Sequence, residues 1–442
     1  MNTETPSWGI EPVPDRLRVL GVFDSFLLWT NFGVSILVLV SAAYLGLSLK
    51  QALLATLLGG LIGNAMLGVA GLIGADARVP AMVLQRAPLG QRGSYLATAL
   101  NVAQCLGWAT FELIIIATAA SALSERAFGF HALWMWKLVF GVVAMAMALL
   151  GPITFVRRFV RKLAIWAVVA SIVYLAWWIP AHANLHRLWT SGGSGGSFFA
   201  GMDLIIALSV SWIPLVADYT RFSRSRAAGF WSAGLGYFIP TVPLFALGAV
   251  IALSRHISDA PGLLTAIAAG GAASVLALLA LTVDESDEAF ANVYSGAVSL
   301  QNLVPRVPQR MLVAGVAATA TVGALVIDLR NYQPFLFLLG SFFVPLFAVL
   351  LADWLLAGRH YEPEHIFRVP EVRLEMVAAW LAGFCLYQWL YPQGPSWWTD
   401  LVAHTHPHAL PWGGASIPSF VAAFGLAAVA RLLARRPILA SA

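Results

Sequence analysis

Five acidic residues lie inside strongly apolar segments, where a charge is hard to accommodate. Glu112 lies in the segment 93–123, and the segment 272–304 holds four more: Asp284, Glu285, Asp287 and Glu288. At the middle of a bilayer an ionised carboxylate costs at least about 2.5 kcal/mol, so it must face a cavity, find a partner or carry a proton. On a helix, these four acids and Asn292 cover an arc of about 160°. The segment 272–304 holds no Lys or Arg, so a bound cation or protons are candidates for neutralising it. Hydrogen bonds to neighbouring helices, without any functional role, are the alternative.

Gln104, Trp108 and Glu112 follow one another at intervals of four residues, so a helix places all three on one face. An indole ring beside a carboxyl and an amide group suits a flat heterocycle with a hydrogen-bonding edge. A tryptophan in an apolar helix usually packs in the core. The Trp-x-x-x-Glu pair in the middle of the segment nevertheless favours a binding site.

Two other apolar segments are interrupted at corresponding places. The segment 23–46 contains Thr30-Asn31-Phe32-Gly33 near its centre, and the segment 198–218 contains Ser209-Val210-Ser211-Trp212-Ile213-Pro214. Small, polar or proline residues leave backbone carbonyl and amide groups free to meet an ion or a ligand. Broken helices in matching positions of two halves point to the central site of a transporter. The pattern predicts two five-segment repeats of opposite topology, about 23–180 and 198–357, in which the two acid-bearing segments are equivalent.

The elements that must position these residues are twelve apolar segments, each long enough to cross about 30 Å of hydrocarbon. Sixty per cent of the 442 residues are hydrophobic, 11% are charged, and the mean hydropathy is +0.79. This composition predicts an all-α polytopic membrane protein, embedded in a lipid bilayer, rather than a soluble domain. The apolar run 262–304 is too long for one helix across a bilayer, so we expect a break at Gly270-Gly271. The twelve segments are 23–46, 51–73, 93–123, 133–152, 163–180, 198–218, 230–254, 272–304, 311–328, 333–357, 374–392 and 414–434.

The loops give an independent test of this topology. The even-numbered connections and the two termini hold 20 of the 26 Lys and Arg residues. This bias predicts an even number of spans in the inner membrane, with both termini in the cytoplasm. The basic residues do not form a stripe that could follow nucleic acid, so we expect no nucleic-acid partner. Those on the predicted cytoplasmic side are Arg16, Arg18, Arg78, Arg86, Arg92, Arg157, Arg158, Arg161, Lys162, Arg221, Arg224, Arg226, Arg306, Arg310, Arg359, Arg368, Arg373, Arg431, Arg435 and Arg436.

A polytopic membrane enzyme is the main alternative class. It would need clustered His or Cys ligands, or a nucleophile with its base, near one membrane face. His404, His406 and His408 could suggest a metal site, but a solvated external loop explains them better. The run Gly192-Gly193-Ser194-Gly195-Gly196 is typical of a flexible connector. A channel is a third class, although carboxylates confined to two segments fit an occluded site better than a pore ring.

Motifs along nearly the whole chain resemble the nucleobase:cation symporter family, which includes cytosine permeases, hydantoin transporters and hydroxymethylpyrimidine transporters. They occur before the first segment, after the second, at the end of the sixth and within the eighth. In order, they are Pro12-Val13-Pro14-Asp15-Arg16, the connector from Gly74 to Gly93, Asp218-Tyr219-Thr220-Arg221-Phe222, and Ser286-Asp287-Glu288-Ala289-Phe290-Ala291-Asn292-Val293-Tyr294-Ser295. Glu112 and the acidic eighth segment are most similar to the hydroxymethylpyrimidine branch.

The resemblance implies a LeuT-like core of two inverted five-helix repeats over 23–357, working by alternating access. The residues 1–22 would form a cytoplasmic N-terminal tail. The residues 358–442 would add two further transmembrane helices and a cytoplasmic tail.

The resemblance also implies residue roles. Trp108 stacks on the substrate, and Glu112, where the family has Gln, bonds its edge. Further substrate contacts map to Ser35 and Asn292, and less well to Ser209, Ser211 and Trp212. The coupling ion maps to the backbone of Asn31, Val34 and Val283 and to the side chains of Ser286 and Asp287. Because Asp287 replaces a usual threonine, the coupling ion is left open between sodium and a proton.

The expected function is therefore import of a nucleobase-like aminopyrimidine, hydroxymethylpyrimidine or cytosine, by cation symport. A symporter of another nucleobase or of a hydantoin is the nearest alternative. We expect no cofactor, and no metal site beyond a possible sodium site.

Overall fold

A computed structural model describes residues 9–150, 165–269, 271–328, 332–405 and 414–434. These residues form helices joined by short loops, and one isolated bridge between Leu20 and Ser223 is the only β pairing among them. Several residues used in the sequence argument lie outside the described ranges: Arg157, Arg158, Arg161, Lys162, Gly270, His406, His408, Arg435 and Arg436.

Each of the twelve predicted segments coincides with one helix or with one pair of helices. The first five correspond to α1 (Val22–Phe32) with α2 (Ile36–Ser41), α3 (Leu49–Ala77), α6 (Gly93–Phe128), α7 (Leu133–Leu150) and α9 (Ile165–Ala181). The next five correspond to α11 (Phe198–Val210) with α12 (Ile213–Thr220), α13 (Arg226–Arg255), α15 (Ala272–Asp284) with α16 (Ser286–Leu303), α17 (Gln309–Val326) and α18 (Tyr332–Leu356). The last two correspond to α20 (Leu374–Leu390) and α22 (Ser416–Ala434).

Shorter helices lie in the connections. They are the 3-10 turns η1 (Asp15–Leu17) and η2 (Ala42–Tyr44), and the helices α4 (Ala81–Leu84), α5 (Arg86–Leu89), α10 (Leu185–Thr190), α14 (Ala260–Ala268), α19 (Glu364–Phe367) and α21 (Ser396–Ala403). Among the described helices, eight are long and apolar enough to cross a membrane, and the bent pair α1 and α2 with η2 makes a ninth. α9 and α20 contribute shorter apolar helices.

Both predicted interruptions are present. The chain leaves α1 at Phe32, and the two parts of the first span meet at 48°. In the sixth span, Ser211 and Trp212 separate α11 from α12, although the two parts form a single span from Phe198 to Thr220.

The eighth span departs from the prediction of one long helix over 272–304. The chain does leave the preceding helix α14 near Gly271, whose φ is +97°. A second break then occurs at Glu285, between α15 and α16. The Glu285 side chain is turned away to another helix, as described below, and the adjoining turn is tight because Glu288 N–H bonds to the Glu285 carbonyl at 3.2 Å.

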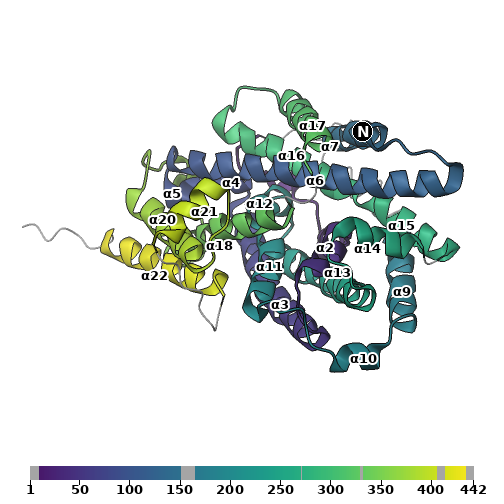
Figure 1. Cartoon of the computed structure of the whole chain (residues 1–442). Coiled ribbons are helices and arrows are strands. Elements are labelled where there is room, and N and C mark those ends of the chain that lie inside the picture. The colour runs from purple at the N-terminus through teal and green to yellow at the C-terminus, as the bar shows by residue number, and fades with distance from the viewer. Residues whose placement is uncertain (1–8, 151–164, 270, 329–331, 406–413, 435–442) are drawn as a thin grey trace, which may run out of the picture.

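The core is built by helices that are far apart in sequence. α3 packs against both α11 and α13, and α6 packs against α16 and α17 (Figure 1). Gly33, at the break of the first span, allows the backbone of that span to lie close against α13. A Cβ atom there would lie 2.6 Å from the ring of Pro240 and 2.8 Å from the carbonyl oxygen of Tyr237.

The last helices, α20, α21 and α22, gather beside α18 at one side of the bundle (Figure 1). The carboxylate of Asp353 in α18 pairs with Arg373 at 2.8 Å and with Arg431 of α22 at 3.1 Å. The Tyr361 hydroxyl donates to the same carboxylate at 2.8 Å. Burial raises the pKa of the Tyr361 phenol well above its ordinary value, so it stays a donor at neutral pH.

Asp203 of α11 holds the N-terminus of α22. Its carboxylate accepts hydrogen bonds from the backbone N–H groups of Ala415 at 2.6 Å and Ser416 at 3.1 Å. Asp203 is thus an N-cap supplied from a distant part of the chain.

The segment before α1 lies along the end of the sixth span. Leu20 N–H bonds to the Phe222 carbonyl, and Arg224 N–H bonds back to the Leu20 carbonyl. The Arg18 guanidinium donates to the Ser223 carbonyl at 3.0 Å. One glycine of the exposed run Gly192–Gly196 contacts the loop before α3. Gly196 N–H bonds to the Gly46 carbonyl at 3.0 Å, and a Cβ atom at Gly196 would collide with Leu45.

Candidate functional site

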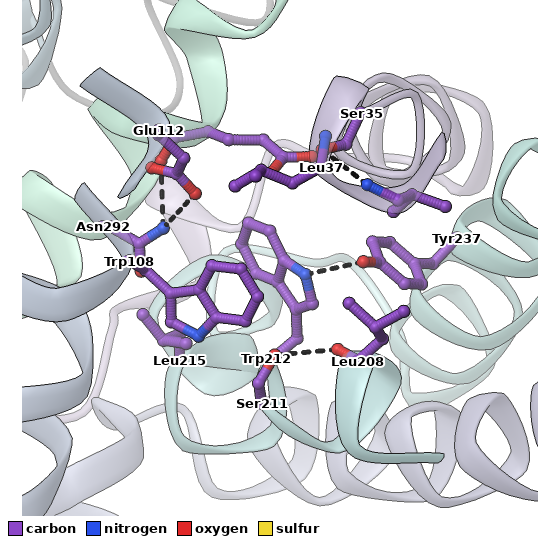
Figure 2. A pocket seen from close by; sticks show the side chains of 12 residues that line it. Ser35, Leu37, Trp108, Glu112, Leu208, Ser211, Trp212, Leu215, Tyr237 and Asn292 are labelled. Carbon is purple, nitrogen blue, oxygen red and sulfur yellow. Dashed lines mark hydrogen bonds between the residues drawn. The ribbon is translucent and has the colours of Figure 1, made fainter. Parts of the chain in front are cut away.

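A narrow cavity of about 10 Å³ lies where the broken spans meet α6, α13 and α16 (Figure 2). Its small volume means that its walls lie close together. It is lined by Ser35, Leu37, Val38, Trp108, Glu112, Leu208, Ser211, Trp212, Leu215, Tyr237, Glu288 and Asn292. A flat heterocycle therefore enters only if these walls separate.

One side of the cavity is polar. The Asn292 amide of α16 donates to Glu112 Oε1 of α6 at 2.9 Å and to the Glu288 carbonyl at 3.2 Å. Glu112 Oε2 and Asn292 Oδ1 are buried and have no hydrogen-bond partner among the described residues. These two oxygens are acceptors that a ligand edge can satisfy.

Two indole rings form the aromatic part of the cavity (Figure 2). Trp108 is held edge-on by Tyr332 and Phe335, with ring centroids 5.7 and 5.8 Å away. Its indole N–H has no partner among the described residues. Trp212 stacks on Phe32 at 5.0 Å with an interplanar angle of 15°. Offset stacking and edge contacts of this kind fix ring positions, so both indoles are rigid surfaces for a planar ligand.

Beside the cavity, the Glu285 carboxylate binds polar groups at the break of the first span. Its carboxylate accepts from the backbone N–H of Ile36 at 2.5 Å, from the Leu37 N–H at 3.4 Å and from the Ser35 hydroxyl at 2.9 Å. The N-terminus of a helix carries a partial positive charge from unpaired N–H groups. Glu285 thus supplies acceptor oxygens where α2 needs them, and it joins the eighth span to the first.

The remaining predicted ion-site residues lie around the same junction. The Asn31 amide donates to Asp287, and the Asn31 carbonyl accepts from Val34 N–H at 3.1 Å. Ser286 is buried at the start of α16. Val283 lies in the last turn of α15 with its side chain 48% exposed on the outside of the bundle, so only its backbone can serve this site. Asp284 is 2% exposed, and neither of its carboxylate oxygens has a hydrogen-bond partner in the described part of the chain.

Two predicted substrate residues do not line the cavity. Gln104 donates to the Ser211 carbonyl at 2.8 Å and to Asn101 at 2.9 Å. Ser209 faces α3, where its hydroxyl accepts from Asn64 at 3.1 Å. The structure brings the other six predicted substrate residues together around the cavity: Ser35, Trp108, Glu112, Ser211, Trp212 and Asn292.

Sequence reasoning missed several residues of the site. Tyr237 of α13 lines the cavity, and it is the only tyrosine between Arg226 and Arg255. A lone tyrosine three residues before a helical proline was an available but weak signal. Glu285 and Glu288 were predicted only to raise the local affinity for the coupling cation, because spacing alone does not tell which acid faces a break and which faces a cavity. The apolar residues Leu37, Val38, Leu208 and Leu215 carried no signal of their own.

A protein-family model described as a permease for cytosine/purines, uracil, thiamine, allantoin matches residues 12–385. The chain belongs to this family of nucleobase:cation symporters. The permease is 24% identical to the cytosine permease of Escherichia coli strain K12 over 364 residues, which cover 78% of this chain and 80% of that one. It is 25% identical to the hydantoin permease of Microbacterium maritypicum over 303 residues, which cover 63% of this chain and 60% of that one.

Solved structures show the same fold. The permease matches MHP1, a nucleobase-cation-symport-1 family transporter in a closed conformation with bromovinylhydantoin bound, with a TM-score of 0.77 and 19% identity over 98% of this chain and 96% of that one. A Na+-coupled sialic acid symporter matches with a TM-score of 0.66 at 9% identity, over 94% and 90% of the two chains. The permease is thus a multi-pass membrane transporter of the nucleobase and hydantoin type, and not an enzyme.

Proposed function

We propose that this permease imports an aminopyrimidine, hydroxymethylpyrimidine or cytosine, together with a cation. The observation that carries the proposal is the Glu112 and Asn292 pair, which presents free acceptor oxygens into a cavity walled by Trp108 and Trp212. An aminopyrimidine offers an amino donor beside a ring-nitrogen acceptor. A protonated Glu112 matches that edge with one acceptor and one donor, and an ionised Glu112 matches the ring-protonated base.

The proposed coupling site is the junction of the first and eighth spans. Asn31, Val34 and Val283 would contribute backbone groups, and Ser286 and Asp287 would contribute side chains. The contact between Asn31 and Asp287 supports this assignment because it joins the two spans at their breaks. Sodium and a proton are both compatible with an oxygen-rich junction of this kind.

We also propose a division of the chain into repeats and additional spans. The residues 23–357 would form two inverted repeats of five spans, and 358–442 would add two further spans. The two breaks in the first and sixth spans, and the position of α20 and α22 beside α18, support this division. We place the permease in the inner membrane with 1–22 and the C-terminal tail in the cytoplasm.

Thermal unfolding of the purified permease with single ligands tests the substrate proposal, since a ligand that binds the folded state raises the unfolding temperature. Hydroxymethylpyrimidine and cytosine are expected to stabilise it. Uracil and thymine are expected not to, because they carry a carbonyl in place of the amino donor. Stabilisation by hydantoin alone, with no response to aminopyrimidines, would assign the permease to the hydantoin substrates instead.

Substitution of Glu112 tests which residue recognises the amino edge. Glu112→Leu is expected to weaken aminopyrimidine binding by about 1–3 kcal/mol, or roughly 5- to 150-fold, because the buried edge of the base loses its partner. Glu112→Gln keeps an acceptor and a donor, so its effect is expected to be modest. Glu125→Gln, on an exposed part of the same helix, is the matched control. Normal binding by Glu112→Leu, or equal competition by uracil and cytosine, would contradict the assignment.

A further inference from the structure

We propose that Tyr237 is a second specificity-determining residue, which donates its hydroxyl hydrogen to a ring nitrogen on the far side of the substrate from Glu112. This inference rests on the proposed function and narrows it. It favours 4-aminopyrimidines, in which the nitrogen opposite the amino-bearing carbon is an unprotonated acceptor.

The first support is the direction of the hydrogen bond at Tyr237. The Trp212 indole N–H donates to the Tyr237 oxygen at 3.0 Å. An indole nitrogen can only donate, so the tyrosine oxygen must accept in this contact. The described residues show no hydrogen bond in which this hydroxyl is the donor, which leaves its own hydrogen for a different acceptor.

The second support is that the hydroxyl is held in place. Tyr237 is 2% exposed, and its ring contacts both Trp29 and Trp212, with centroids 6.4 and 5.9 Å away. Trp212 is itself fixed by stacking on Phe32. The backbone of Tyr237 sits against Gly33 at the break of the first span. A donor fixed by packing loses little conformational freedom when it binds a ligand.

The third support is the short supply of donors in the cavity. The Ser35 hydroxyl donates to Glu285, and the Ser211 hydroxyl donates to the Leu208 carbonyl. The Trp212 N–H is used by Tyr237. Among the lining side chains other than the carboxyl groups of Glu112 and Glu288, the donors left for a ligand are therefore the Trp108 N–H and the Tyr237 O–H.

The position of this donor sets the chemistry of the ligand. Glu112 and Asn292 lie on one side of the two indoles and Tyr237 lies on the other (Figure 2). A pyrimidine that places its amino edge against Glu112 turns the ring nitrogen opposite the amino-bearing carbon toward Tyr237. In hydroxymethylpyrimidine this nitrogen is an acceptor. In cytosine it carries a hydrogen, so cytosine offers a donor where Tyr237 needs an acceptor and is expected to bind more weakly.

Two small ligands isolate this contact. 4-Aminopyrimidine has the amino edge and the opposite ring nitrogen, whereas 2-aminopyridine keeps the amino edge and has a C–H group in place of that nitrogen. Their affinities are measured by calorimetry on the full-length purified permease, at a pH where both ligands are neutral. The wild-type permease is expected to bind 4-aminopyrimidine more tightly.

Tyr237→Phe is expected to weaken 4-aminopyrimidine binding about 5- to 150-fold and to leave 2-aminopyridine binding unchanged, because only the first ligand loses a hydrogen bond. Trp212→Phe keeps an aromatic wall but removes the N–H that orients the hydroxyl. It is expected to reduce the preference for 4-aminopyrimidine partly. Tyr174→Phe, whose hydroxyl contacts Ser274 away from the cavity, is the matched control, and unfolding temperatures without ligand check that each variant folds.

Equal loss of both ligands in Tyr237→Phe, or no loss of either, overturns the assignment of Tyr237 while the proposed function stands. Tighter binding of 2-aminopyridine by the wild type also overturns it. If the wild type binds neither ligand, or if Glu112→Leu binds 4-aminopyrimidine normally, the proposed function fails and the role of Tyr237 falls with it.

Discussion

Asp287 is the second acidic residue, after Glu285, that joins the eighth span directly to the break of the first. Its carboxylate receives the Asn31 amide, and its second oxygen, Oδ1, is buried without a hydrogen-bond partner among the described residues. A carboxylate in that position can accept a hydrogen bond at the span junction and bind a cation at the same time, because each oxygen has more than one lone pair.

Asp287→Asn separates these two roles. The amide still accepts from Asn31 through its oxygen, so membrane insertion and surface expression are expected to be nearly normal. The lost charge is expected to lower uptake at limiting ion concentration by about tenfold or more. Uptake assays in which sodium and pH are varied separately show which ion dependence has changed. Unchanged uptake with an unchanged ion dependence would show that Asp287 is not part of the coupling site. Asp400→Asn, on an exposed helix face, is the control.

At the residue scale, helical spacing predicted only part of the site. Trp108 and Glu112 share a face of α6 and reach the cavity, but Gln104, one turn earlier, is bonded to the backbone of the sixth span. Spacing places side chains on a face, and it does not say how far the neighbouring helix extends along that face. Tyr237 was missed for the same reason, since its role depends on Trp212, which is 25 residues away in the chain.

At the scale of elements, carboxylates from distant helices cap two helix N-termini. Glu285 caps α2 and Asp203 caps α22. A helix that starts inside a membrane protein has unpaired N–H groups that water does not reach, so these groups need other acceptors. At α2 the acceptors are the Ser35 hydroxyl for Leu37 and Val38 and the Glu285 carboxylate for Ile36. The interruptions at Gly33 and Pro214 were predictable from glycine and proline. The break at Glu285 was not, because nothing in an acidic run signals that one side chain will leave its own helix for another.

Asp203→Ala tests the second cap. Removing an N-cap acceptor costs about 0.5–2 kcal/mol, so the unfolding temperature of the purified permease is expected to fall. Gly414→Ala is expected to act in the same direction, because a Cβ at Gly414 would collide with the Asp203 carboxylate and the backbone there has a φ of +61°. Asp400→Ala is the control. Unfolding of Asp203→Ala at the wild-type temperature would show that α22 is held by its packing on α18 and α20 alone.

At the scale of the whole molecule, the predicted orientation can be tested at two positions. A reporter fused after Arg436, which lies outside the described residues, is expected to be cytoplasmic. A reporter inserted at His404, in the turn after α21, is expected to be external. Alkaline phosphatase and green fluorescent protein fusions give opposite readouts on the two sides of the membrane. The reverse result at either position would contradict the twelve-span topology.

The pairing of the N-terminal segment with the end of the sixth span has a consequence for the order of assembly. Arg18 and its acceptor Ser223 are 205 residues apart. At about 5–20 residues per second, synthesis of that stretch takes about 10–40 s. During this interval the early segment has been made but its partner has not. The contact therefore forms only after about the first half of the 442-residue chain has been made, and a fusion that blocks Leu20 is expected to delay maturation before it alters transport.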